Sequence, residues 1–188
     1  MKITFEVSSK LMPEAEVLKK FKDDWGYIRA PRDAPFRNLA FVAPRREYFI
    51  ATILTPKEYK GKIAGYCGIG FYDDLLTDSG AYTLGGIAAS EETEGNAIDL
   101  RGNGVYTALR DKRNNYVEPE SVRRGLPFLV LLARTSSAAP YYINRGYVEN
   151  STNIPSWALG RVRGRNWFVY NENVNNAMKK AWSIIKGV

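Results

Sequence analysis

The chain has 188 residues, 45% of them hydrophobic and 25% charged, which suits one globular domain with a substantial core. It contains no histidine and one cysteine, Cys67. Ser-His and Cys-His nucleophile systems, histidine metal ligands and an intrachain disulfide are therefore excluded. No apolar run approaches the roughly 18 residues that cross a membrane, and the first residues lack a signal-peptide core, so we expect a cytosolic protein. The apolar run around Cys67 indicates a buried, inert thiol.

The net charge of +7 is unevenly distributed. Residues 1–100 carry 13 Lys and Arg against 15 Asp and Glu, a net charge of −2. Residues 101–188 carry 14 Lys and Arg against 5 Asp and Glu, a net charge of +9. A basic half indicates an anionic partner, such as nucleic acid, an acidic surface or a phosphorylated cofactor. The alternative is that the basic residues only solvate the surface.

The first half of the chain is predicted to be mostly strand. Its apolar, β-branched and aromatic runs predict strands at residues 2–8, 39–42, 47–54, 62–72 and 81–89. A helix is expected at residues 13–21, where acidic residues follow Pro13 and lysines come later. Loops or polar turns are expected at residues 26–38, 56–61 and 73–80. Three consecutive strands then form an antiparallel meander.

The second half alternates helices with strands. A helix is expected over residues 105–113, followed by a polar stretch. The continuous apolar run at residues 126–133 is typical of a strand buried on both faces. A short helix that Ser136 or Ser137 can cap, a late strand and an amphipathic helix are predicted at residues 136–145, 167–170 and 173–185. This element order predicts one domain of the α+β (mixed α/β) class over residues 1–188.

The segment Arg101-Gly102-Asn103-Gly104-Val105-Tyr106 resembles the acyl-CoA-binding motif of Gcn5-related N-acetyltransferases, the GNAT superfamily. Arg101 and Gly104 match that motif, Gly102 is a small residue within the loop, and Tyr106 departs because a small residue is expected there. Glycines let backbone N–H groups approach the CoA pyrophosphate, the following helix presents its N-terminus, and an arginine adds a charge-assisted contact. The resemblance therefore implies that these six residues bind CoA. A plain tight turn is the alternative.

A second segment, Ala138 to Tyr147, is similar to the family's Ala-x-x-x-Tyr-x-x-x-Gly-Phe pattern. The resemblance implies that the Tyr142 hydroxyl protonates the departing CoA thiolate, since tyrosine with its ordinary pKa near 10 keeps its proton. The alternatives are a core-edge aromatic, or Tyr141 in this role if the register slips by one. Thr135 falls, loosely, where the family often has an Asn that contacts the pantetheine arm.

The resemblance covers roughly residues 45–148. It implies a GNAT-like fold, with a central, mostly antiparallel twisted sheet, a β-α-β CoA-binding core and flanking helices. Residues 149–188 supply the final strands and an additional helix. In the family, the strand before the glycine loop offers backbone amides to the acyl carbonyl. Residues 83–89 fit that strand, although residues 90–100 separate it from Arg101.

The resemblance also implies the reaction. An amine of unidentified type attacks the thioester of acetyl-CoA directly within a ternary complex, with no metal. Because the chain has no histidine, the general base is a carboxylate or a water chain. Glu92 is preferred slightly over Glu91 and Glu94, a solvated acidic loop being the alternative for each, and Asp73 and Asp74 are weaker candidates.

The acceptor amine belongs to a small molecule, a protein or a nucleic acid. Arg161, Arg163 and Arg165 interleave with Trp167, as in single-strand nucleic-acid binders. The alternative is a basic turn before a strand whose tryptophan packs inward. A further alternative is a non-catalytic, nucleic-acid-binding protein on the same fold.

Overall fold

The computed structural model describes residues 1–25, 43–83, 99–134, 136–152, 154–160, 162 and 164–171. They form two compact units. The first contains residues 1–25, 45–69, 79–83 and 99–115, and the second contains residues 43–44, 70–78 and the described residues from 116 onward. Three elements pass through both units, namely β4 (Ile63–Phe71), β5 (Leu76–Thr83) and α4 (Val105–Arg124).

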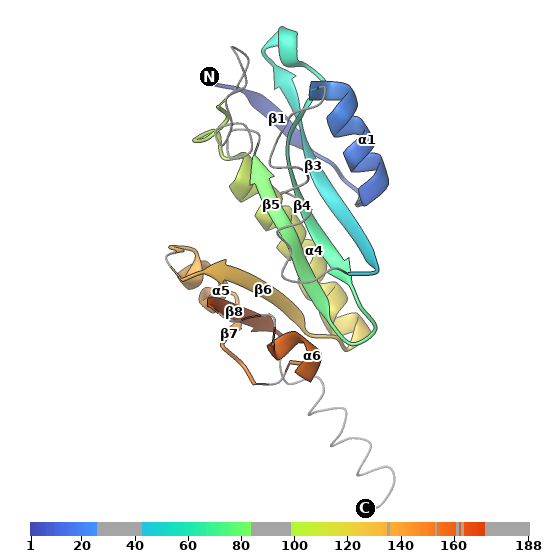
Figure 1. Cartoon of the computed structure of the whole chain (residues 1–188). Helices are drawn as coiled ribbons and strands as arrows, with labels where there is room; N and C mark the ends of the chain where they lie inside the picture. Colours follow the sequence, from blue (N-terminus) through green and yellow to red (C-terminus); the bar gives the residue numbers. More distant parts are fainter. Residues whose placement is uncertain are drawn as a thin grey trace, which may run out of the picture. The chain divides into compact units, whose positions relative to one another are not determined.

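The first unit is a sheet with helices on both faces. In strand order, β1 is followed by β3, β4 and β5, and both β1 and β2 pair antiparallel with β3. Figure 1 shows α1 lying along β3. The remaining elements of this unit are β1 (Thr4–Val7), β2 (Met12–Pro13), α1 (Glu14–Trp25), β3 (Arg45–Thr55) and the 3-10 turn η1 (Lys57–Tyr59).

Strand β3 divides the core of this unit because successive side chains point to opposite faces. Tyr48 and Ile50 pack with α1 through the buried Val17. Phe49, Ala51 and Ile53 pack on the other face, in the cluster that holds Leu100 and the first turns of α4.

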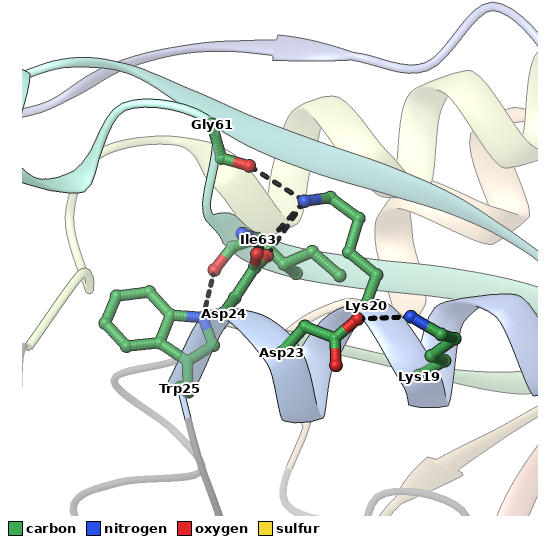
Figure 2. Close-up of polar contacts among 7 residues, drawn as sticks. All are labelled: Lys19, Lys20, Asp23, Asp24, Trp25, Gly61 and Ile63. Carbon is green, nitrogen blue, oxygen red and sulfur yellow. Dashed lines mark hydrogen bonds and ion pairs between the residues drawn. The ribbon is translucent and has the colours of Figure 1, made fainter.

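Side chains at the C-terminal end of α1 form hydrogen bonds with the backbone at the start of β4 (Figure 2). Lys20 Nζ donates to the Asp24 carboxylate at 3.0 and 3.1 Å and to the Gly61 carbonyl at 2.9 Å. Asp24 Oδ2 also accepts from the Ile63 amide at 2.7 Å, and Trp25 Nε1 donates to the Ile63 carbonyl at 2.9 Å. The turn before β4 is thereby fixed by side chains as well as by its own backbone.

The second unit is built around a short mixed sheet. Strand β6 pairs antiparallel with β8 from Phe128↔Tyr170 to Ala133↔Arg165, and β8 pairs antiparallel with β7 (Figure 1). Strand β5 pairs parallel with β6 at the first two residues of each strand. The elements that belong only to this unit are β6 (Phe128–Ala133), α5 (Ala139–Asn144), β7 (Val148–Glu149), α6 (Ser156–Leu159) and β8 (Arg165–Tyr170).

Several expectations are confirmed. The α+β class, the mostly antiparallel pairing and the β-α-β unit, here β5-α4-β6, are all present. The strands expected at residues 47–54, 62–72, 126–133 and 167–170 and the helix expected at residues 13–21 are found with slightly different bounds. Cys67 is buried, as expected. The single domain over residues 1–188 stays a prediction.

Three expectations are wrong. Strand β5 begins at Leu76, inside the expected polar turn, because Thr77 and Ser79 are buried despite their polarity. The polar stretch after residue 113 continues α4 to Arg124. Neither Ser136 nor Ser137 caps α5, because its N-cap is Ala138; Ser136 Oγ instead accepts a bond from the Ala138 amide at 3.2 Å.

Other expectations fall outside the described residues. They are the loop at residues 26–38, the strand at residues 39–42, residues 84–89 of the strand before the glycine loop, and the C-terminal helix. Within the described residues, no helix is long and apolar enough to cross a membrane.

Candidate CoA site

The glycine loop runs from Arg101 to Gly104 and leads directly into α4. Gly102 and Gly104 have φ values of +79° and +77°, a backbone conformation that residues with a Cβ adopt only under strain. A Cβ built on either glycine would meet nothing within 4 Å. The glycines are therefore required by backbone conformation, and the space beside them is open to a ligand.

The first turn of α4 faces the same space. The first four N–H groups of an α-helix have no partner within the helix. The first turn carries no acidic side chain, so nothing there neutralises the partial positive charge of the helix end. Val105 and Leu109 are buried in the core cluster behind the loop and fix this helix end against β3. Each such burial contributes about 1.5–3 kcal/mol.

A cavity of about 260 Å³ lies at this junction. It is smaller than the roughly 300–1,000 Å³ of sites that enclose a whole small molecule. A diphosphate group suits it better than a complete nucleotide. Its lining consists of Leu100, Arg101, Gly102, Gly104, Val105, Tyr106 and Thr107.

Arg101 lines the cavity with an exposed side chain, which is bound to Asp99. The guanidinium donates from Nε at 2.8 and 2.9 Å and from Nη2 at 2.5 Å, and the Arg101 amide donates to Asp99 Oδ1 at 2.9 Å. The side-chain hydrogen bond with Arg101 is the main cause that lowers the pKa of Asp99 to about 2. A carboxylate thus occupies the face of Arg101 that would contact a phosphate.

Asn103 ties the loop to the start of the chain. Its Oδ1 accepts a hydrogen bond from the Ile3 amide at 3.0 Å, and its Nδ2 donates to the carbonyls of Met1 and Leu100, both at 3.0 Å. These bonds engage the side chain with the protein itself. Asn103 is not among the residues that line the cavity.

Tyr106, the departure from the family motif, is 38% exposed and lines the cavity. The Arg110 guanidinium carbon lies 5.8 Å from the centre of its ring.

Tyr142 belongs to the second unit, where α5 carries it into an aromatic cluster. Its side chain is 1% exposed, stacks on Phe168 at 5.7 Å between ring centres and meets Tyr147 edge-on at 5.1 Å. The neighbouring Tyr141 is half-buried, and the Arg145 guanidinium carbon lies 5.5 Å from its ring centre. Tyr142 is therefore packed as an aromatic residue of the core, which is the surrounding that the core-edge alternative describes.

Other expected site residues have different surroundings. Arg165 is exposed on β8, whereas Trp167 packs against the apolar cluster around Leu129 and donates from Nε1 to the Ser151 carbonyl at 2.9 Å. The inward-packed alternative for Trp167 is the one observed. Asp74 accepts a hydrogen bond from Trp157 Nε1 at 3.1 Å. Outside the described residues lie Glu91, Glu92, Glu94, Thr135, Arg161 and Arg163.

Two residues were not anticipated, namely Asp99, which binds Arg101, and Glu118, which binds Arg145 and Tyr147. Asp99 was missed although it lies two residues before Arg101, close enough for a local ion pair. Glu118 was missed because the polar stretch that contains it gave no helical signal. Within the described ranges, no group of three or more His, Cys, Asp and Glu residues could hold a metal ion.

The chain has no match among protein-family models or curated sequences. Among solved structures, those similar to it are named mainly as acetyltransferases and acyl-CoA N-acyltransferases, and two of the names give the GNAT family.

A GNAT-family acetyltransferase from Staphylococcus aureus is 11% identical, with a TM-score of 0.46 over 89% of this chain and 98% of that one. An acyl-CoA N-acyltransferase from Pseudomonas aeruginosa is 10% identical, with a TM-score of 0.46 over 89% and 99%. An acetyltransferase from Streptococcus agalactiae is 12% identical, with a TM-score of 0.44 over 88% and 97%. At these values we draw no functional conclusion from the likeness.

Proposed function

We propose that the chain is an acyl-CoA-dependent N-acyltransferase of the GNAT type, which transfers an acetyl group from acetyl-CoA to an amine. The observation that carries the proposal is the cavity beside Arg101. Two open glycines, the start of a 20-residue helix and an arginine meet there. Backbone amides at a helix N-terminus with a neighbouring guanidinium are the groups that bind a diphosphate.

The contacts of Arg101 suggest how the diphosphate binds. Asp99 holds the guanidinium through Nε and Nη2, which is the pairing that a phosphate also accepts. A phosphate therefore replaces Asp99 on this face of Arg101. The amides of the loop and of the first turn of α4 supply the remaining hydrogen bonds. The rest of CoA lies outside this small cavity.

In the reaction we propose, the amine nitrogen attacks the thioester carbonyl carbon. The C–N bond forms as the C–S bond breaks. The ammonium first gives one proton to Glu92 or to water. As the thiolate departs, Tyr142 gives its hydroxyl proton to the sulfur, and the second proton lost by the nitrogen returns through water to the Tyr142 oxygen. Tyrosine suits the role of acid because its ordinary pKa near 10 keeps it protonated at neutral pH.

Calorimetric titration with acetyl-CoA and, separately, with CoA tests the proposal. We expect micromolar binding that Arg101→Ala weakens by about tenfold, the value of one charge-assisted hydrogen bond. Arg45→Ala is the matched control, since Arg45 is another exposed arginine of the first unit that is paired with a carboxylate. Binding by the parent that Arg101→Ala leaves unchanged would remove Arg101 from the site. A folded protein that binds neither ligand would overturn the proposed function.

A further inference from the structure

Glu118, in the part of α4 that belongs to the second unit, contacts two residues that follow α5. Its carboxylate accepts from Arg145 Nε at 2.7 Å and from Arg145 Nη2 at 2.6 Å, one bond to each oxygen. Its Oε1 also accepts from the Tyr147 hydroxyl at 3.1 Å. The side chains of Glu118 and Arg145 are 12% and 27% exposed. One carboxylate therefore binds two side chains in a largely buried place.

Arg145 and Tyr147 also form hydrogen bonds with the backbone of Tyr142. The amides of Arg145 and Tyr147 both donate to the Tyr142 carbonyl, at 3.0 and 3.1 Å. The ring of Tyr147 also packs edge-on against the ring of Tyr142. Arg145 and Tyr147 thus each contact Glu118 through the side chain and Tyr142 through the backbone.

The contacts of Glu118 with Arg145 and Tyr147 are strong enough to fix the position of the segment at residues 145–147. A two-pronged arginine–carboxylate pair is geometrically specific, and partial burial protects it from the screening that weakens exposed pairs. The hydrogen bond that Arg145 donates to Glu118 is the main cause that raises the pKa of Arg145, so its guanidinium remains charged. Tyr142 is enclosed by Phe168 and Tyr147, so its ring moves if the segment at residues 145–147 moves.

We propose that Glu118 is a positioning residue, which fixes the Tyr142 hydroxyl for proton transfer by anchoring Arg145 and Tyr147. The inference rests on the proposed function, in which Tyr142 is the proton donor. A displacement of about 1 Å at a reacting group can cost as much as a hundredfold in rate. Glu118 therefore acts on turnover and leaves the binding of CoA to other residues.

Steady-state kinetics of Glu118→Gln tests this role, with Glu120→Gln as the matched control. Glu120 lies on the same helix and is bound to Arg123 and Arg124 instead. We expect Glu118→Gln to lower kcat by roughly tenfold with little change in the KM for acetyl-CoA, and Glu120→Gln to match the parent. In the Tyr142→Phe background, Glu118→Gln should cause no further loss. Independent, multiplicative losses would show that Glu118 does not act through Tyr142.

Amide hydrogen exchange provides a readout that needs no activity. We expect Glu118→Gln to speed exchange at the Arg145 and Tyr147 amides by about tenfold or more, while Glu120→Gln leaves both unchanged. Arg145→Lys, which keeps the charge but loses the two-pronged contact, should give the same pattern more weakly. Unchanged protection in both Glu118→Gln and Arg145→Lys would overturn the positioning role. If the protein has no acyltransferase activity, the proposed function is overturned. Faster exchange in Glu118→Gln would then still show that Glu118 positions the segment next to Tyr142.

Discussion

The ring of Tyr48 lies against Gly68, in the space that a side chain at Gly68 would occupy. A Cβ built on Gly68 would lie 2.3 Å from the ring carbons Cδ1 and Cε1 of Tyr48. Tyr48 is fully buried and donates from its hydroxyl to Glu14 at 3.0 Å, so its ring cannot move away cheaply. We expect Gly68→Ala to destabilise the protein by about 1–3 kcal/mol, the usual cost of overpacking a core. Urea unfolding measures this change.

Gly160→Ala is the control for that substitution. Gly160 is at the end of α6 with a φ of −65°, and a Cβ there would meet nothing within 4 Å. We expect Gly160→Ala to change the free energy of unfolding of the protein by less than about 0.5 kcal/mol. Equal effects of the two substitutions would show that Tyr48 does not restrict Gly68.

Asp99→Asn should strengthen the binding of CoA a few-fold. The substitution removes the anion that competes with phosphate for the guanidinium of Arg101, and an amide binds that group less strongly. Asp23→Asn changes the net charge equally at another exposed carboxylate of the first unit and should have little effect. Calorimetry with CoA compares the variants. Weaker binding by Asp99→Asn would mean that Asp99 instead orients Arg101 for the ligand.

Tyr142→Phe should lower turnover by roughly a hundredfold, within the range for loss of a general acid. The affinity for CoA should remain nearly intact, because the substitution removes only the hydroxyl. Tyr141→Phe is the natural control, since it removes the same group from the neighbouring residue of α5. A Tyr142→Phe variant as fast as the parent, beside a slow Tyr141→Phe variant, would assign the proton transfer to Tyr141.

Acid should destabilise the protein through two carboxylates. Hydrogen bonds from Arg101 to Asp99 and from Arg123 to Glu120 lower both pKa values to about 2, from ordinary values of 3.8 and 4.5. The unfolded chain therefore takes up protons first as the pH falls. Both contributions are present above about pH 4.5 and are lost between about pH 4.5 and 2.

Thermal unfolding followed by circular dichroism from pH 6 to 2 measures this loss. The double variant with Asp99→Asn and Glu120→Gln should lose less stability over the window than the parent does. The difference should be modest because exposed ion pairs contribute little. Identical pH profiles would show that neither pair contributes to stability.

The sequence predicted strand β6 and the glycine loop because their signals are local. Residues 126–133 are a continuous apolar run, and a left-handed turn before a helix needs glycine at defined positions. The length of α4 was not predictable by the same reasoning. Its buried residues include Arg113, Asn114 and Ser121, so the periodicity of apolar residues that reveals a helix is interrupted by polar side chains.

The candidate site shows the same limit of local signals. Arg101, Gly102 and Gly104 were found through the resemblance of their segment to a family motif, and they do line one cavity. The contacts of Asn103 with Met1 and Ile3 join residues about 100 positions apart, and no local pattern reports them. Glu118 and Arg145 are 27 positions apart in the sequence, so their contact could be recognised only from the fold.

The tryptophans among the described residues are divided between the two units, so fluorescence can follow each unit separately. Trp25 stacks on Tyr59 in the first unit, whereas Trp157 and Trp167 pack around Leu129 in the second. Variants that keep either Trp25 alone or Trp157 and Trp167 alone therefore report, by fluorescence, the unfolding of one unit at a time. Coincident transitions would mean that α4, β4 and β5 join the units into one cooperative body, and separated transitions would mean that each unit melts independently.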